Sequence, residues 1–315
     1  MIRRPPRSTL SSSSAASDVY KRQAIELNDS SSRAYYQRGL LKASIQMYEE
    51  AVADYNRSIE LDGNNLEAFY SRGESRANLE DFMGAIEDYD KMIEHAQNPA
   101  LAYKQRGIFK MKIMDYKGAE SDLALALDMD NTDKEILYNL GQVKTNLNNF
   151  DEAIELLSQA LRIDPNYYLA YGTRGGAHIR RNNYRQAIAD FDRAITLNNE
   201  YKRAYYGRGI AKALSNDYPG SIQDFNRVIE LDNQFYQAYY NRAVSKAIQG
   251  NHKEALHDYD IIIKADPRNF EAYYNRGISR MNTRDTEGAC SDFRRALELG
   301  YQPAEPMLRM YCRAN

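Results

Sequence analysis

Arginine and aspartate recur together along this sequence at a spacing that suits ion pairing. In seven places an aspartate follows an arginine after sixteen residues, and the pairs repeat with a period of 34 residues. The arginines are Arg38, Arg72, Arg106, Arg174, Arg208, Arg242 and Arg276, and the aspartates are Asp54, Asp88, Asp122, Asp190, Asp224, Asp258 and Asp292. An arginine can hold a carboxylate through two parallel hydrogen bonds while its stem covers apolar surface. We therefore predict structural ion pairs between two helices.

One period of this pattern lacks both charges, because Leu140 and Leu156 stand where the arginine and the aspartate are expected. The joint replacement by two apolar residues indicates that the two positions contact each other. A basic residue four positions after each arginine, such as Lys42 or Lys246, is an alternative partner for the aspartate. The sequence leaves the choice between the two partners open.

Residues with catalytic or metal-binding chemistry do not form a recognisable site. None of the four histidines (His95, His178, His252 and His257) occurs in an HExxH motif or a Cys/His cluster. No glycine-rich phosphate loop follows a predicted strand. The 26 tyrosines fall almost entirely at repeated positions, where aromatic side chains usually belong to a core. We therefore expect no catalytic residue, no metal site and no cofactor, and a protein that is not an enzyme.

The two cysteines, Cys290 and Cys312, are too few for a disulfide framework. They are 22 residues apart and could be neighbours in space. We expect buried or unreactive thiols rather than a disulfide.

Small residues define an internal repeat, and the elements of this repeat must position the arginines and aspartates. One series keeps the 34-residue spacing and consists of Gly39, Gly73, Gly107, Gly141, Gly175, Gly209, Ala243 and Gly277. A second series consists of Ala51, Ala85, Ala119, Ala153, Ala187, Ser221, Ala255 and Ala289. Eight units in one register predict a repeat architecture. We number positions 1 to 34 within each repeat, and the repeats start at residues 32, 66, 100, 134, 168, 202, 236 and 270.

Each repeat contains two segments with apolar residues at i, i+3, i+4 and i+7, which is typical of amphipathic helices. The small residues at positions 8 and 20 allow the two helices to approach closely. Large side chains should fill the space beside that crossing, namely Tyr55, Tyr89, Phe191, Phe225, Tyr259 and Phe293. A single helix pair cannot bury its own apolar faces, so the pairs must stack into an all-α solenoid.

The pattern resembles the tetratricopeptide repeat (TPR), a 34-residue helix-turn-helix. In the fifth repeat the matching residues are Tyr171, Gly175, Ala187, Phe191 and Ala194. The resemblance covers residues 32–303. It implies a right-handed superhelix whose first helices line a concave groove that binds peptides or partner proteins, and we expect a bacterial origin.

The two ends of the chain differ in character. Residues 304–315 should form a capping helix that turns Met307, Leu308, Met310 and Tyr311 toward the last repeat. Residues 24–31 read as the tail of a truncated repeat. Residues 1–23, with a Pro-Pro pair and a serine run, resemble a translated sequencing-adapter artefact, a transit peptide being the alternative. We expect this leader to be disordered, and the uncapped first repeat to fray or to mediate homo-oligomerisation.

Charge and hydropathy restrict the partners. Without residues 1–23 the chain has 37 basic and 43 acidic residues, a net charge of −6, which argues against nucleic acid. No apolar run approaches the roughly 18 residues of a membrane span, so we expect no membrane insertion. Cytoplasmic and periplasmic locations both stay open.

We interpret the chain as a non-catalytic scaffold that binds a protein or peptide partner. The alternatives are a regulatory fragment of a larger enzyme or receptor and, less in keeping with the acidic charge, an RNA-binding helical array. Positions 2, 5, 6, 9, 12 and 13 should face the groove. The predicted peptide-binding residues are Tyr206, Ile210, Tyr240, Asn241, Val244, Tyr274, Asn275 and Ile278. The opposing interpretation is that these residues are ordinary for the family and merely pack between repeats.

Overall fold

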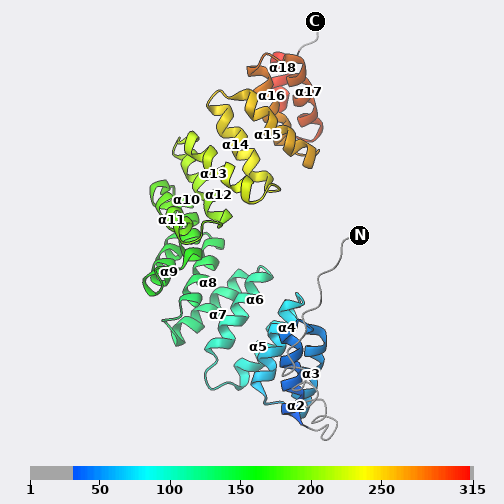
Figure 1. Ribbon diagram of the computed structural model, residues 1–315, viewed down its shortest axis with the longest axis vertical. Coiled ribbons are helices and arrows are strands. Elements are labelled where there is room, and N and C mark those ends of the chain that lie inside the picture. Colours follow the sequence, from blue (N-terminus) through cyan, green and yellow to red (C-terminus); the bar gives the residue numbers. More distant parts are fainter. Residues whose placement is uncertain (1–30, 313–315) are drawn as a thin grey trace, which may run out of the picture. The chain divides into compact units, whose positions relative to one another are not determined.

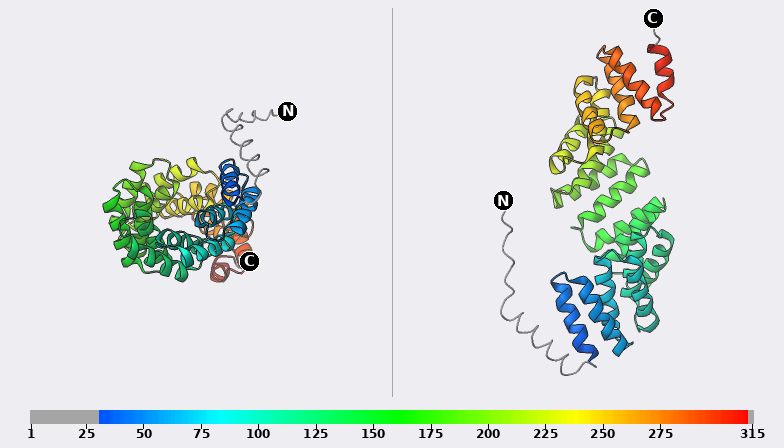
Figure 2. Two further views of the ribbon diagram at one scale, coloured as in Figure 1. Left: turned by 90° about the horizontal axis from the view of Figure 1, so that it is seen from below. Right: turned by 90° about the vertical axis from the view of Figure 1, so that its right-hand side faces the viewer.

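The computed structural model describes residues 31–312, and this part of the chain contains 17 α-helices and no β-strand. Within each of the two compact parts described below, the two helices of a repeat run antiparallel (Figure 1), and the pairs follow one another along the chain (Figure 2). The first helices are α2 (Ser32–Ser44), α4 (Leu66–Asn78), α6 (Ala100–Lys112), α8 (Lys134–Asn146), α10 (Tyr168–Arg180), α12 (Lys202–Leu214), α14 (Tyr236–Ile248) and α16 (Phe270–Asn282). The second helices are α3 (Tyr48–Leu61), α5 (Phe82–His95), α7 (Tyr116–Met129), α9 (Phe150–Ile163), α11 (Tyr184–Leu197), α13 (Tyr218–Leu231), α15 (His252–Ala265) and α17 (Thr286–Glu298). The all-α repeat solenoid is thereby confirmed.

The helices divide into two compact parts, one from α2 to α8 and the other from α9 to α18. In the C-terminal part, α10 contacts α12, α12 contacts α14 and α14 contacts α16, and α11, α13 and α15 each pack against two consecutive first helices. In this part the first helices therefore form one layer and the second helices another. No helix within residues 31–312 combines the length and the apolar composition needed to cross a membrane. The leader at residues 1–23 and the repeat tail up to residue 30 lie outside the described residues.

The turn between the two helices of a repeat has the same backbone in all eight repeats. Position 15 adopts a positive φ of 59–82°, in Gln46, Glu80, Met114, Asn148, Asn182, Asn216, Gly250 and Arg284. A residue in the left-handed conformation just after a helix ends the helix and allows its last carbonyl groups to accept hydrogen bonds from backbone N–H groups. In four repeats an aspartate then accepts a hydrogen bond from the backbone N–H three residues later, as Asp285 does from Gly288 at 2.9 Å. Such N-caps satisfy amides that lack a partner within the helix.

The close helix crossing predicted from the small residues is present. The six large side chains predicted to fill the space beside it are all buried, at most 3% exposed. At Gly277, for example, a methyl group would lie 2.7 Å from Phe293 Cε1. The ring therefore occupies the volume that a side chain at position 8 would need.

Two adjacent glycines of α10 should respond to alanine in opposite directions. A methyl group at Gly175 would lie 2.9 Å from Phe191 Cζ, whereas a methyl group at Gly176 would meet no atom within 4 Å. Gly176→Ala should stabilise the protein by about 1 kcal/mol through helix propensity. Gly175→Ala should destabilise it by about 1–3 kcal/mol through overpacking. Urea denaturation of the two variants checks both signs, and an equal effect of the two substitutions would contradict this packing.

All seven predicted arginine–aspartate pairs are confirmed. Each arginine donates from Nε and Nη2 to the carboxylate oxygens of its aspartate over 2.5–3.1 Å. The seven aspartates are buried. At Asp88 burial raises the pKa of the carboxyl, and the contacts with Arg72 and Arg76 oppose that rise.

The basic residue at position 11 is a second partner of the aspartate rather than a competitor. Six of the seven aspartates also lie 2.8–3.1 Å from a lysine or arginine at this position. The seventh, Asp190, faces His178 at 3.8 Å, and burial lowers the pKa of that histidine. In the fourth repeat, which lacks the aspartate, Lys144 instead pairs with Glu120 at 2.6 Å.

A third contact of the arginines joins consecutive repeats. In six repeats Nη1 donates over 2.5–2.8 Å to a side-chain oxygen on the second helix of the preceding repeat. Arg242, for instance, reaches Asn226 in α13 as well as Asp258 in α15. In these six repeats the arginine at position 7 therefore joins the two helices of its own repeat and also joins them to the preceding repeat.

The C-terminal segment contains the two departures from expectation. Helix α18 (Ala304–Tyr311) packs Ala304, Met307 and Leu308 against the core of the last repeat. Met310 and Tyr311 were predicted to face that core, but they are 69% and 46% exposed. Met310 is turned away by about 120° from Ala304 on an α-helix, and Tyr311 is the last helical residue.

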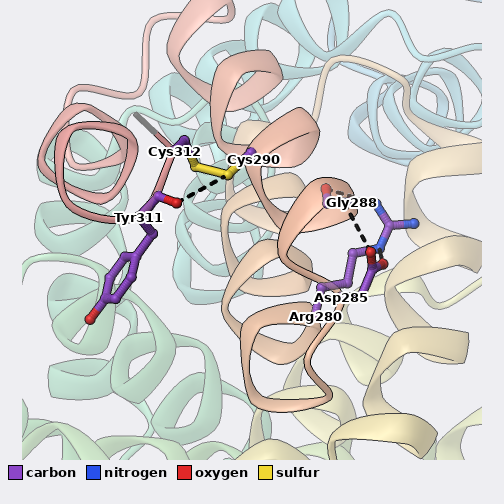
Figure 3. Close-up of a disulfide and its surroundings, with 6 residues drawn as sticks. All are labelled: Arg280, Asp285, Gly288, Cys290, Tyr311 and Cys312. Atoms are coloured by element: carbon purple, nitrogen blue, oxygen red, sulfur yellow. Dashed lines mark hydrogen bonds and ion pairs between the residues drawn. A yellow bond between two sulfur atoms is a disulfide. The ribbon is translucent and has the colours of Figure 1, made fainter. Parts of the chain in front are cut away.

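The prediction of unpaired thiols is also wrong. Cys290 in α17 and Cys312 after α18 form a disulfide, with Cα atoms 5.6 Å apart (Figure 3). It forms because α18 folds back along α17, which returns residue 312 to the second helix of the last repeat. The side chain of Tyr311 points away from this bond (Figure 3).

Candidate functional site

The eight predicted peptide-binding residues lie on three consecutive first helices, α12, α14 and α16. All eight are half-buried, so each presents part of its side chain to solvent. Successive members of this set of helices contact each other, so the residues form a continuous surface in the C-terminal part. The structure divides this surface into two pockets.

Tyrosines at position 5 and asparagines at position 6 form a hydrogen-bonded ladder across the three helices. Asn241 Nδ2 donates to Tyr206 Oη at 3.0 Å, and Asn275 Nδ2 donates to Tyr240 Oη at 2.9 Å. Asn241 Nδ2 also donates to the backbone oxygen of Gln237 at 3.0 Å. Both N–H groups of Asn241 are thus used within the chain, so this residue offers a ligand its carbonyl oxygen Oδ1.

The larger pocket has a volume of about 500 Å³ and contains three of the eight predicted residues. It is lined by Tyr206, Tyr236, Gln237, Tyr240, Asn241, Ile262, Ala265, Asp266, Asn269 and Glu271. Its walls come from α12, α14 and the end of α15, and the α15–α16 turn and the start of α16 complete the rim. Three tyrosine rings, two carboxylates and three amide side chains are among the groups around this space.

The smaller pocket has a volume of about 210 Å³ and contains three further predicted residues, Val244, Asn275 and Ile278. Its other lining residues are Ala247, Ile248, His252, Tyr259 and Ser279. The Tyr240–Asn275 hydrogen bond joins a residue of the larger pocket to a residue of the smaller one. The two pockets are therefore neighbours along α14 and α16.

The remaining two predicted residues lie outside both pockets. Ile210 packs beside the buried cluster formed by Phe225, Val228 and Ala238. The ring of Tyr274 lies 5.8 Å from that of Phe293 and 5.0 Å from that of Tyr301. For these two residues the contacts match the opposing interpretation, packing between repeats.

Several pocket residues are absent from the set predicted from the sequence. Gln237 and Glu271 occupy position 2, which is expected to face the groove, although neither residue is in that set. Asp266 and Asn269 come from the turn that follows α15, whereas the prediction is confined to first helices. Tyr236 at position 1 is missing from it as well. All five residues lie at the junction of two repeats, and this shared position is the signal from which the sequence could have predicted them.

Two of the pocket tyrosines, Tyr206 and Tyr240, have raised pKa values. Burial raises the pKa of Tyr206, and the hydrogen bond from Asn241 opposes that rise. Burial also raises the pKa of Tyr240, and the negative charge of Glu271 raises it further. Both hydroxyls therefore stay protonated at neutral pH. Within residues 31–312 no three His, Cys, Asp or Glu side chains gather in a way that could hold a metal ion.

The fold and this surface define a class of helical repeat protein. Matches to the tetratricopeptide repeat cover residues 32–65, 135–167, 173–234 and 236–303. The chain belongs to the tetratricopeptide repeat family. No curated protein matches the sequence.

Solved structures show the same fold. A tetratricopeptide repeat protein from Parabacteroides merdae is 22% identical, with a TM-score of 0.58 over 79% of this chain and 99% of its own. YrrB, described as a TPR protein with an unusual peptide-binding site, is 23% identical, with a TM-score of 0.51 over 58% of this chain and 95% of its own. The APC/C hetero-tetramer Cut9–Hcn1 is similar at 13% identity and a TM-score of 0.62, over 95% of this chain and 59% of that one.

Proposed function

We propose that the chain is a non-catalytic scaffold that binds a peptide segment of a partner protein across α12, α14 and α16. The observation that carries this proposal is the pair of neighbouring pockets linked by the Tyr240–Asn275 hydrogen bond. Two adjacent recesses suit a chain molecule, whose successive side chains can enter them in turn.

The chemistry of the two pockets supports a peptide ligand. The smaller pocket has an aliphatic floor of Val244, Ala247 and Ile278, which suits an apolar side chain. The larger pocket offers Asn241 Oδ1 and two tyrosine hydroxyls, which suit the amide groups of a peptide backbone. Membership of the TPR family agrees with this role, as does the peptide-binding site described for YrrB.

A comparison of partners recovered by variants tests the proposal. We expect a Tyr240→Ala, Asn241→Ala variant to lose the partners that the wild-type chain retains from an extract of its native organism, because the substitutions remove the wall of the larger pocket. A Tyr236→Ala variant should lose them as well, and Tyr236 is 40% exposed, so its removal should leave the fold intact.

The matched control is Tyr70→Ala, Ser71→Ala, which changes positions 5 and 6 of the second repeat in the N-terminal part. It should retain the same partners as the wild type. Circular dichroism establishes that each variant is folded. Equal recovery of the same partners by the wild type and by a folded Tyr236→Ala variant would refute binding at this surface.

A further inference from the structure

The larger pocket combines aromatic rings with negative charge. The rings of Tyr206, Tyr236 and Tyr240 line it, and the carboxylates of Asp266 and Glu271 stand at its rim. No lysine, arginine or histidine is among its lining residues. Within residues 31–312 neither carboxylate forms an ion pair, and the backbone N–H of Arg268 donates to Asp266 Oδ1 at 3.0 Å. Both carboxylates are on exposed residues, so a ligand can reach them.

The third repeat contains the corresponding pocket, four 34-residue periods earlier in the sequence. Its volume is about 290 Å³, and its lining includes Lys104, Asp130 and Asp133. Lys104 occupies the position of Tyr240, and its Nζ lies 2.8 Å from Asp133 Oδ2 and 2.6 Å from Glu135 Oε2. Glu135 corresponds to Glu271. In this pocket the chain therefore supplies its own cation to the carboxylates.

The sixth repeat provides a second example. Lys202, at the position of Tyr236, pairs with Asp232, at the position of Asp266. Its Nζ also lies 5.2 Å from the centre of the Phe235 ring, a distance suited to a cation–π contact. An ammonium group between an aromatic ring and a carboxylate is thus already present at this place in the fold.

The larger pocket, at the seventh repeat, retains both carboxylates but has no counterpart of Lys104 or Lys202. Tyr236 and Tyr240 stand in their places, while Asp266 and Glu271 remain. We propose that this pocket binds the positively charged side chain, lysine or arginine, of the partner peptide. The inference rests on the proposed function, since it assigns a chemical class to one residue of the peptide that the surface binds.

The groups around the pocket are suited to a cation. Tyrosine faces attract ammonium and guanidinium groups. Carboxylates form short, charge-assisted hydrogen bonds with the same groups. Asn241 uses its N–H groups on Tyr206 and on the Gln237 backbone, so it contributes its oxygen acceptor to the pocket. These rings, carboxylates and amide oxygen all present negative charge or electron density to a ligand.

Selection of random phage-displayed peptides on the full chain tests the inference. We expect the peptides whose binding is lost in Tyr236→Ala to share a lysine or arginine at one place. Replacing that residue by norleucine or citrulline should weaken binding about tenfold, as the loss of a cation–π contact and a charge-assisted hydrogen bond implies. Calorimetric titration of synthetic peptides measures the change, and exchange of lysine for arginine shows which head group the pocket prefers.

Variants of the protein provide the reciprocal test. Glu271→Gln should weaken the binding of the basic peptides several-fold, and Glu271→Lys should weaken their binding more strongly. Glu67→Gln is the matched control, because Glu67 occupies position 2 in the first turn of α4, in the N-terminal part; it should leave affinity unchanged.

The outcomes separate the two proposals. Some peptides could need Tyr236 for binding and yet bind equally well after neutralisation of their basic residue and to the Glu271→Gln variant. That result would overturn the cation site and leave peptide binding at this surface intact. Failure to recover any peptide that depends on Tyr236 would count against both.

Discussion

Replacing Asp258 by alanine is expected to lower the free energy of unfolding by about 3–5 kcal/mol, the range found when one partner of a buried ion pair is removed. The carboxylate is fully buried, and it accepts hydrogen bonds from Arg242 Nε at 3.0 Å and Arg242 Nη2 at 2.5 Å. Lys246 Nζ lies 3.1 Å away. The substitution would leave two cations without their shared anion in a site largely shielded from water.

A double-mutant cycle isolates the contact itself. Asp258→Ala, Arg242→Ala and the double variant should give a coupling free energy on the order of 0.5–3 kcal/mol, as expected for residues in direct contact. Urea denaturation supplies the free energies of unfolding of the wild type and of the three variants. Hydrogen exchange in α14 and α15 supplies a local value, because the stability of a repeat array is a sum of local terms. Additive effects of the two single substitutions would show that the pair is not energetically coupled.

Two controls accompany the cycle. Asp260→Ala removes a carboxylate that pairs with Arg276 at 2.7 Å but whose side chain is 57% exposed, so its effect should be about 1 kcal/mol or less. Arg242→Leu combined with Asp258→Leu copies the leucines that the fourth repeat has at these two positions. This double variant should be more stable than Asp258→Ala, because it removes the buried charges together.

The repeat period made much of this fold predictable from the sequence. Contacts within one repeat recur seven or eight times, so that any joint change stands out. The loss of both charges at Leu140 and Leu156 was sufficient to indicate that the two positions contact each other. The glycine at position 8 likewise predicted its aromatic neighbour, as at Gly277 and Phe293. Local sequence spacing determines such contacts, because a helix pair has few ways to close.

Contacts between repeats were not predictable in the same way. The hydrogen bond from Arg242 Nη1 to Asn226 depends on how closely two repeats stack, and its acceptor varies among asparagine, aspartate and serine. The acidic rim of the larger pocket has the same origin, since Asp266 and Glu271 belong to a turn and to the next helix. The sequence indicated which face of the first helices to consider, but it did not indicate that the turn after α15 completes the larger pocket.

The disulfide needed three-dimensional information for a further reason. A separation of 22 residues between Cys290 and Cys312 is compatible with many geometries. Only the reversal of the chain at α18, which lays that helix against α17, brings the two sulfur atoms together. The same reversal determines which face of α18 is buried, and so leaves Met310 in solvent.

Reduction of the Cys290–Cys312 disulfide is expected to loosen α18 selectively. A cross-link that closes a loop of this length stabilises the linked segment by about 3 kcal/mol in the chain-entropy account. Because α18 is a helix of eight residues that packs on α17 of the last repeat, the loss should remain local. Amide exchange in Ala304–Tyr311 should accelerate by about a hundredfold on addition of a reductant, since about 1.4 kcal/mol corresponds to a factor of ten.

A Cys290→Ser, Cys312→Ser variant should exchange rapidly in this segment with or without reductant, which separates the bond from other effects of the reagent. Protection in α12 and α14 should stay unchanged and serves as the internal reference. Ala304 and Leu308 would still pack on Phe293 part of the time, so exchange should be faster than in the oxidised chain but slower than in an unfolded peptide. Equal protection of α18 in the oxidised protein, the reduced protein and the serine variant would mean that the packing of Ala304, Met307 and Leu308 holds the helix in place without the disulfide.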